Sequence, residues 1–486
     1  MARQSLFARL GNMDMTKGNL FPKLALFALP LALTSMMQLL YTTVDLISVR
    51  FGDSGAAAAS ISANGSLINL IIVLFNNVAL GANVMLASSK GAKDQDKANL
   101  VLHTSLLFAI FSGFAVGILG FFLSPYLLQA MGTSAHLVEN ATAYLRIYFI
   151  GLPFLMVFNY LAQMLRAQGD SRSPFLILTL AGLVNVGFDL LFVFVFKMSV
   201  RGVGYATIIA EALSAVLAIV TFVKKKDSFA RLHLSSLRID GKTLGEVLRI
   251  GIPAGLQGFF FSLPNVFIQS ALYTIDPSPA GDALENGAIA SGNIESYLFA
   301  GVDAIAMATM SFTAQNNGAR KAENLKKVFI FGHIWGLIYY VIAIALATAF
   351  GRNFLTLFVD EEASIGPGMD RLMVMASFYF LNALMGISAG SLRGNKHSTF
   401  PMVVTLITCT AFRIVYLQTL FVYVPFFHNV TWLYALFPVT WGLAAACNVP
   451  ASIYYLRKEG RRIKQELQEI EKAAEGSTAL EGSDLD

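Results

Sequence analysis

Charged residues are scarce in this chain. Asp, Glu, Lys and Arg make up only 13% of its 486 residues, whereas soluble domains carry roughly 25%. Hydrophobic residues account for 56% of the chain, and the mean hydropathy is +0.62. This balance excludes an ordinary water-soluble domain and predicts an integral membrane protein.

Cysteine is nearly absent as well. The two cysteines, Cys409 and Cys447, both fall in apolar stretches and belong to no CxxC pair. We therefore expect no disulfide framework and no metal site built on cysteine. The segment 1–20 is basic and polar and lacks the pattern of a cleaved secretory signal. The breaks between apolar stretches are short, which leaves no soluble catalytic domain.

Apolar runs long enough to cross about 30 Å of hydrocarbon recur along the whole chain. We predict twelve spans: 24–47, 56–86, 100–123, 140–164, 174–196, 202–223, 246–275, 286–316, 325–350, 372–392, 400–424 and 431–456. Lys and Arg concentrate in the connections after even-numbered spans, which predicts that these connections and both termini are cytoplasmic. The basic connection from Lys224 to Lys242 lies between the sixth and seventh spans.

The apolar sequence contains an internal repeat. The segment from Arg166 to Pro174, RAQGDSRSP, returns in altered form as RGNKHSTFP, from Arg393 to Pro401. The separation of Arg166 from Arg393, the repeat spacing, also relates 91–93 to 318–320 and 63–65 to 290–292. Duplicated hydrophobic halves are typical of transporters that rock one half against the other. We interpret the two nine-residue segments as cytoplasmic turns or hinges.

The predicted fold is an all-α membrane protein with two six-helix lobes. Because each half holds six spans, both cross the membrane in the same sense, and a pseudo-two-fold axis along the membrane normal relates them. The predicted parts are a cytoplasmic segment at 1–23, an N-lobe at 24–223, a cytoplasmic linker at 224–245, a C-lobe at 246–456 and a cytoplasmic charged tail at 457–486. We expect the tail to begin as a charged helix and to be disordered at its end.

Polar residues within the spans mark candidate sites, because a carboxylate at the bilayer centre costs about 2.5–3.5 kcal/mol. Asp45 ends the first span, and Asn185 and Asp189 lie one turn apart in the fifth. Thr207 lies in the sixth span. Two acids with amide and hydroxyl oxygens suit a hard cation, and two acids in apolar surroundings would also hold a proton. An alternative is that both acids lie in headgroup water at the span ends.

These features together resemble the multidrug and toxic compound extrusion (MATE) family, most closely its prokaryotic DinF-like branch. The resemblance covers residues 20–456 and rests on the duplicated half, the 166–174 turn and the acids of spans one and five. It implies that Asp45, Asn185, Asp189 and Thr207 bind the coupling ion. It also implies a supporting polar cluster made of Gln38, Tyr41 and Asn159.

The C-lobe departs from the NorM-like branch of that family. Span seven has no acid, and span ten has Asn382 where that branch has Asp. Arg413 lies in the middle of span eleven, and we predict that Asp303 or Glu295 pairs with it in at least one conformation, because an isolated guanidinium there is costly. A fixed ion pair and a substrate role are both open for these charges. The candidates for the substrate cavity are Asn69, Asn76, Asn83, Glu295, Asp303, Asn382 and Arg413.

We therefore predict a secondary-active antiporter that exports cationic or amphipathic organic compounds in exchange for H⁺ or Na⁺. The alternatives are a flippase for a lipid-linked precursor, from a related branch of the superfamily, and a membrane-embedded enzyme. The spans and loops carry no His/Asp or Ser/His cluster, so we expect no enzymatic activity. We expect no cofactor and no metal beyond a possible Na⁺. The expected setting is a prokaryotic plasma (inner) membrane, where the chain acts as a monomer on a small organic molecule without nucleic acid.

Overall fold

The computed structural model describes residues 11–52, 55–131, 133, 135–225, 228–275, 279–359 and 361–483, and its regular structure there is helical throughout. The N-terminal half holds α2 (Leu20–Gly52), α3 (Gly55–Val78), α4 (Leu80–Gly91), α5 (Gln95–Ala130), α6 (Ala135–Ala167), α7 (Arg172–Leu190), the π-helical turn η1 (Leu191–Val195) and α8 (Ser199–Lys224). The connection holds the short 3₁₀ turn η2 (Leu234–Ser236). The C-terminal half holds α9 (Gly241–Ile275), α10 (Pro279–Gly318), α11 (Ala322–Leu355), α12 (Glu362–Gly394), α13 (Thr399–Thr405), the π-helical turn η3 (Leu406–Ala411), α14 (Phe412–Gln418), α15 (Leu420–Tyr423) and α16 (Val430–Ser483).

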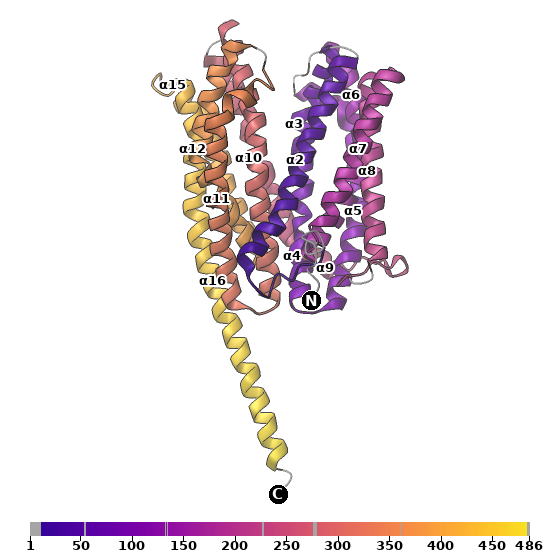
Figure 1. Ribbon diagram of the computed structural model, residues 1–486, viewed down its shortest axis with the longest axis vertical. Helices are drawn as coiled ribbons and strands as arrows, with labels where there is room; N and C mark the ends of the chain where they lie inside the picture. The colour runs from indigo at the N-terminus through magenta and orange to yellow at the C-terminus, as the bar shows by residue number, and fades with distance from the viewer. Residues whose placement is uncertain are drawn as a thin grey trace.

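Twelve helical segments of the described chain are long and apolar enough to cross a bilayer. Each of them overlaps one of the twelve predicted spans, so the predicted number is confirmed. The helices α2–α8 form an N-lobe and α9–α16 form a C-lobe, and the two lobes stand side by side (Figure 1).

The internal repeat extends to backbone conformation. Lys93 and Arg320, which the repeat spacing relates, have φ angles of 59° and 55°. Gly169 and Lys396, related in the same way, have φ angles of 88° and 66°. Each of these latter turns is closed by the same hydrogen bond, from the amide of that residue to the carbonyl three residues earlier, at 2.9 and 2.8 Å. The two halves therefore fold alike, as the duplicated sequence predicts.

The helix α2 is shared between the lobes. Leu24 and Leu31, from its first half, lie in the hydrophobic core of the C-lobe. Tyr41, further along, donates a hydrogen bond from its hydroxyl to the carbonyl of Thr179 in α7 of the N-lobe, at 3.3 Å. Pro30 interrupts the hydrogen-bond ladder of α2 close to the point where the helix passes from one lobe to the other.

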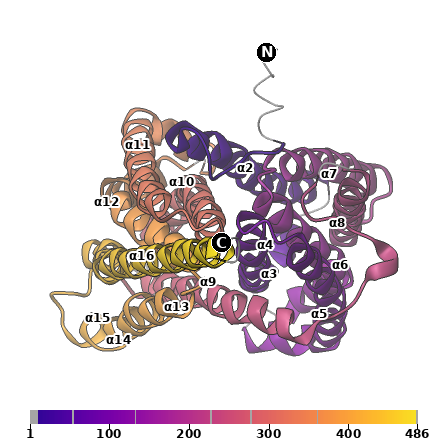
Figure 2. The ribbon, with the colours of Figure 1, turned by 90° about the horizontal axis from the view of Figure 1, so that it is seen from below.

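The helix α9 is exchanged in the same way. Val247, Ile250 and Ala254 from its first half belong to the core of the N-lobe. Ile268 and Leu272 from its second half belong to the core of the C-lobe. Seen from below, α2 and α9 bridge the two lobes on opposite sides of the molecule (Figure 2). This arrangement repeats the half-turn relationship of the lobes.

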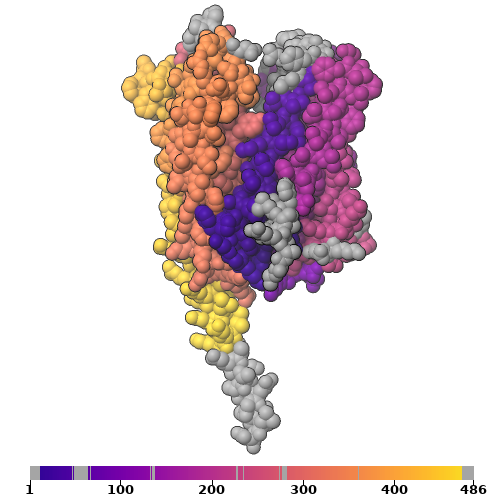
Figure 3. Space-filling view, in the orientation of Figure 1, coloured from indigo at the N-terminus to yellow at the C-terminus, as the bar shows by residue number. Residues whose placement is uncertain are grey.

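The lobes meet toward the end of the molecule from which α16 projects, and a hollow separates them at the opposite end (Figure 3). At the closed end, the hydroxyl of Ser311 in α10 donates to Oδ1 of Asn83 in α4 at 3.1 Å. Asn83 donates in turn to the carbonyl of Gln163 in α6 at 3.0 Å. These hydrogen bonds lie below the hollow and close the molecule on that side.

The C-terminal segment differs from the expectation of a disordered end. The helix α16 continues without interruption to Ser483 and projects well beyond the lobes (Figure 1). Glu, Lys, Arg and Ala dominate this stretch and are strong helix formers. Arg462 also pairs with Glu466, four residues further on, at 3.7 Å. The predictions for residues 1–10 and 484–486 lie outside the described chain.

Candidate functional site

The N-lobe interior gathers acidic side chains from three helices. Asp45 on α2 and Asp189 on α7 lie within hydrogen-bonding reach of each other. The phenol of Tyr144 on α6 lies within electrostatic range of both acids and also of Glu211 on α8. Asn185 is buried on α7, one turn before Asp189. The structure therefore brings together the two acids that the sequence predicted as a pair.

The two acids lack protein donors. Both carboxyl oxygens of Asp189 and Oδ1 of Asp45 are buried and accept no hydrogen bond from any donor in the described chain. Asp189 is fully inaccessible to solvent. A buried carboxylate without a donor or a counter-charge is costly, because it loses its hydration and gains nothing in exchange. A proton shared between the carboxyls, or a bound cation, would compensate for this loss.

Local backbone features position these acids. Gly182 on α7 leaves room for the ring of Tyr41, because a Cβ there would overlap that ring. This close approach holds the second half of α2 against α7. Directly after Asp189 and Leu190 the chain widens into the π-helical turn η1. Such turns are frequent at functional sites, and the sequence had given no sign of this one.

The remaining predicted N-lobe residues lie at varying depth. The hydroxyl of Thr207 donates to the carbonyl of Val203 in its own helix, at 2.9 Å. Asn159 on α6 is buried, whereas Gln38 on α2 is exposed. Their ion-binding roles stay predictions.

Sequence reasoning missed Glu211. Its carboxylate faces α6, where an added Cβ on Gly151 would lie only 2.6 Å from Oε2. Tyr148 on α6 lies beside it and has a buried hydroxyl without a hydrogen-bond partner in the described chain. The signal was present, because Glu211 is an acid inside an apolar span, four residues after Thr207.

The C-lobe interior carries the opposite polarity. Arg371 on α12 and Glu295 on α10 form a two-pronged ion pair, with N–O distances of 3.1 and 3.2 Å. Both side chains are only 16% exposed, so this is the fixed ion pair that the sequence had left as one possibility for Glu295. The repeat spacing makes Arg371 the counterpart of Tyr144. The position that lies beside the acids in the N-lobe thus carries a guanidinium in the C-lobe.

In this conformation Arg413 forms an ion pair with neither Asp303 nor Glu295, and the prediction of such a pair in another state stays a prediction. Nε and an Nη atom of Arg413 donate to Oγ1 of Thr440 at 3.0 and 2.8 Å. The guanidinium lies over the ring of Phe437, 4.5 Å from the ring centre. Arg413 is 1% exposed. Its partners are therefore a hydroxyl and an aromatic face, whereas Glu295 pairs with Arg371.

The asparagines predicted to line the substrate cavity differ in burial. Asn69 is exposed, Asn76 is half-buried and Asn83 is 1% exposed. Asn83 makes the hydrogen bonds between helices at the closed end, so in this conformation protein encloses it. Asn382 on α12 is buried as well, with its amide nitrogen unpaired in the described chain.

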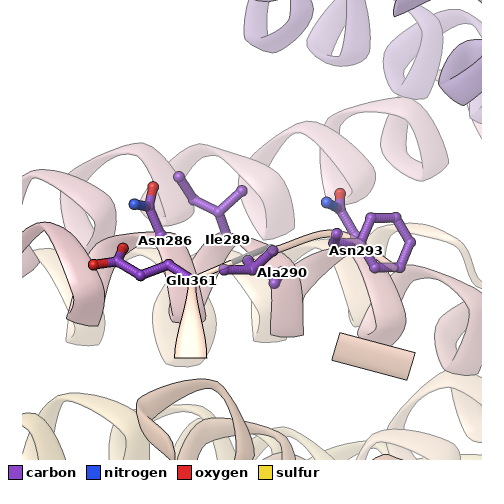
Figure 4. A pocket seen from close by; sticks show the side chains of 7 residues that line it. Asn286, Ile289, Ala290, Asn293 and Glu361 are labelled. Atoms are coloured by element: carbon purple, nitrogen blue, oxygen red, sulfur yellow. The ribbon is translucent and has the colours of Figure 1, made fainter. Parts of the chain in front are cut away.

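A pocket of about 300 Å³ lies outside both polar clusters (Figure 4). Asn286, Ile289, Ala290 and Asn293 of α10 line one side of it. The connection between α11 and α12 lines the other, with Phe358, Val359 and Glu361. The acids of the N-lobe do not reach it.

Known proteins resemble this chain in sequence and in fold. A family model described as MatE matches residues 30–191 and 286–417, more than half of the chain. The probable multidrug resistance protein YoeA of Bacillus subtilis is 25% identical over 402 residues, which cover 80% of this chain and 85% of that protein. The multidrug export protein MepA of Staphylococcus saprophyticus is 23% identical over 465 residues, 93% of this chain and 98% of that protein. A solved structure described as MATE in the bent conformation shows the same fold, with a TM-score of 0.81 at 19% identity over 95% of this chain and 100% of that one.

Proposed function

The chain belongs to the MATE family of multidrug-export transporters, and on that premise we propose that it is a secondary-active antiporter. It exports cationic or amphipathic organic compounds and takes up H⁺ or Na⁺ in exchange. The observation that carries this proposal is the pair Asp45 and Asp189, two buried acids whose oxygens lack donors in the described chain. Family membership in turn favours a transporter over a membrane-embedded enzyme.

The coupling ion acts at these acids. Without a bound ion, two neighbouring carboxylates repel each other in a poorly solvated place. Uptake of a proton or Na⁺ therefore stabilises the site. Asn185, one turn from Asp189, and Thr207 supply neutral oxygens for a cation. Glu211 adds a third acid beside Tyr144.

The helix α2 links ion binding to the lobes. Asp45 and Tyr41 lie in its second half, against the N-lobe, while Leu24 and Leu31 anchor its first half in the C-lobe core. An ion that draws Asp45 toward Asp189 therefore moves a helix that both lobes hold, with Pro30 near the crossing point. Binding shifts the equilibrium between two conformations by as much as the ion's affinities for them differ.

The conformation suits the release of substrate to the outside. With both termini in the cytoplasm, as the basic residues predict, the hollow in Figure 3 opens away from the cytoplasm. Asn69 and Asn76 on α3, together with aromatic rings, offer a cation amide oxygens and ring faces. One charge that crosses gains about 2.3 kcal/mol per 100 mV, and one pH unit adds about 1.36 kcal/mol. Exchange of one proton for one monovalent cation moves no net charge and uses the pH gradient alone.

Transport of a fluorescent organic cation in proteoliposomes tests the proposal. The proteoliposomes are loaded with the cation, and a pH gradient and a Na⁺ gradient are imposed on them in separate experiments. Asp45→Asn and Asp189→Asn should each abolish the gradient-driven flux, because an amide keeps the size but neither exchanges a proton nor neutralises Na⁺. Asp96→Asn, an exposed acid in the first turn of α5, is the matched control and should transport normally. Wild-type rates in both site variants would show that the N-lobe acids do not couple transport.

A further inference from the structure

The segment that precedes α2, residues 11–19, lies against both lobes at the closed end of the molecule. It is the indigo stretch at the lower end of Figure 1. Within it, Met13 and Met15 are only 4% and 0% exposed. We call residues 11–19 the strap. Because the strap is packed against the protein, its hydrogen bonds show which parts of the two lobes it connects.

The strap binds the N-lobe at the first copy of the repeated motif. The amide of Met13 donates to the carbonyl of Gly169 at 3.0 Å. The ammonium group of Lys225, directly after α8, donates to the carbonyl of Gly11 at 2.6 Å and to a carboxylate oxygen of Asp170 at 2.7 Å. A Cβ on Gly169 would overlap the carbonyl oxygen of Met13. The motif turn therefore has room for the strap because its residue is glycine.

The strap binds the C-lobe through a second set of hydrogen bonds. Oε1 of Gln315, near the end of α10, accepts from the amide of Met15 at 2.9 Å. The side-chain amide of Asn316 donates to the carbonyl of Met15 at 2.8 Å. The ammonium group of Lys321 donates to the carbonyl of Thr16 at 2.7 Å. The strap is therefore hydrogen-bonded to both lobes within a few residues.

The hydrophobic contacts of the strap are unequal between the lobes. Met13 and Met15 belong to the hydrophobic core of the C-lobe, together with Leu20 and Leu24 of α2. In the described chain no residue of the strap belongs to the core of the N-lobe. The strap is therefore anchored in the C-lobe, and polar contacts at Gly169 and Lys225 join it to the N-lobe.

The strap crosses the boundary at which the lobes touch. A Cβ on Gly91 of α4 would overlap the carbonyl oxygen of Gln315, so α4 and α10 are in direct contact there. The side chain of the same Gln315 accepts from the strap. A movement that opens the closed end must part α4 from α10. The bonds of the strap to the N-lobe span the same boundary and must break in that movement.

We propose that the strap is a conformational latch, which holds the N-lobe against the C-lobe while the hollow is open at the opposite end. When the closed end opens, the strap leaves Gly169 and Lys225 and stays on the C-lobe. The inference rests on the proposed antiport, because that exchange requires the two ends to open in turn. The strap thereby biases the equilibrium between the two conformations by the free energy of its contacts with the N-lobe.

Distances between the lobes at the closed end test the latch. Asp96 on α5 and Glu323 on α11 are exposed and are related by the repeat spacing. Asp96→Cys and Glu323→Cys provide the sites for two spin labels, and Cys447→Ser removes the exposed native thiol. Double electron–electron resonance is measured on the full chain in lipid nanodiscs, without substrate or gradient. Opening of this end adds a longer component to the distance distribution.

Two lysines form a matched pair of variants. Lys225→Met removes the ammonium group that holds the strap on the N-lobe, and it should raise the ratio of long to short distances about tenfold. Lys321→Met removes the equivalent group on the C-lobe, whose bond persists in both conformations, and it should leave the ratio unchanged. Asp170→Asn removes the ion pair of Lys225 but keeps the bond of that lysine to Gly11, and it should shift the ratio far less than Lys225→Met.

A reversible cross-link provides a second measurement. Gly11→Cys and Lys225→Cys, joined by a bis-methanethiosulfonate reagent in the Cys447→Ser chain, hold the strap on the N-lobe. This link should abolish the flux of an organic cation, and a thiol reductant should restore the flux. The corresponding link on the C-lobe, through Thr16→Cys and Lys321→Cys, should leave the flux unchanged, because that contact is never released.

Three results would overturn the latch. One is full flux through the chain that is cross-linked between positions 11 and 225, since opening would then need no release from the N-lobe. The others are an unchanged distance ratio in Lys225→Met and an equal increase in Lys225→Met and Lys321→Met. The proposed function is judged separately. A chain without flux before any cross-link would reject the antiport, whereas the distances, recorded without a gradient, would still decide on the latch.

Discussion

Gly91 and Gly318 approach each other's helices with no room for a side chain on either. A Cβ on Gly91 would overlap the carbonyl oxygen of Gln315, and a Cβ on Gly318 would overlap that of Ser88. The repeat spacing relates Ser88 to Gln315 and also relates the two glycines. The contact is therefore reciprocal across the axis that relates the lobes, and it sets how closely α4 and α10 meet at the closed end.

Gly318→Ala should lower the free energy of unfolding by about 1–3 kcal/mol, because the added methyl forces two backbones apart. Thermal or denaturant unfolding in detergent measures this change. Gly245→Ala is the control, since a Cβ there meets nothing within 4 Å. That control should be stabilised by about 0.5–1 kcal/mol through helix propensity. Equal stability of the two variants would mean that α4 and α10 separate without cost.

Lys396→Gly should raise the free energy of unfolding by about 0.5–1 kcal/mol, as the balance of two backbone effects. Lys396 has a φ of 66°, a left-handed conformation that costs an L side chain about 1–2 kcal/mol and glycine nothing. The extra chain entropy of glycine offsets about 0.5–1 kcal/mol of that gain. Gly169→Ala, at the equivalent turn, should destabilise, because its Cβ would overlap the carbonyl oxygen of Met13. Destabilisation by Lys396→Gly would show that the lysine side chain stabilises the turn.

Glu211→Gln should weaken the apparent affinity for the coupling ion about tenfold without abolishing transport. Tyr144 lies within electrostatic range of Glu211 as well as of Asp45 and Asp189, so the charge of Glu211 adds to the attraction for a cation. The measurement is the Na⁺ or proton concentration that gives half-maximal flux. An unchanged half-maximal concentration would remove Glu211 from the coupling site.

Replacement of the two interior arginines of the C-lobe, Arg371 and Arg413, should change the free energy of unfolding in different ways. Arg371→Met leaves Glu295 buried without its partner and should cost about 3–5 kcal/mol of stability. Arg413→Met removes a buried charge that no acid compensates and should change stability by less than about 1 kcal/mol, or increase it. Unfolding curves of both variants, recorded under the same conditions, compare them. A large loss with Arg413→Met would show that Thr440 and the ring of Phe437 hold the guanidinium favourably.

His397 should make the fold sensitive to acid. Burial lowers the pKa of this imidazole below its usual 6.5, and the ring stacks on Tyr455 with a centroid distance of 3.9 Å. A lowered histidine pKa means that the unfolded chain binds more protons, so stability is present above pH 6.5 and falls as the pH drops below it. His397→Phe should flatten this fall in melting temperature between about pH 7 and pH 5. An unchanged slope would assign the acid sensitivity to other groups.

The sequence predicted the features that depend on one helix at a time. Apolar runs predict the spans, and the constant repeat spacing predicts that the halves fold alike. The pairing of Asp45 with Asp189 followed from the resemblance, and the structure brings the two acids together. The sequence did not predict the contacts that depend on how the helices are rotated against one another. The sequence offered Glu295 and Asp303 as partners of Arg413, but it could not show that Arg371 pairs with Glu295.

The arginines of the repeated motif show the same limit. Their local sequence describes a turn, and the turn is present, with Gly169 in the left-handed region. Their guanidinium groups lie within electrostatic range of Asp303, which is distant in sequence from both. Only the packing of three helices shows that one segment serves both as a turn and as a charged surface.

Because the first halves of α2 and α9 each pack in the opposite lobe, neither hydrophobic core is complete until the second half of the chain has been partly synthesised. The first six spans lack part of their own interior until Val247, Ile250 and Ala254 have left the ribosome. Leu24 and Leu31 likewise lack their core contacts until Ile268 and Leu272, which lie in the second half of the chain, have been synthesised. Fragments divided within the 224–245 connection would each be incomplete alone, and each would find its missing piece only in the other.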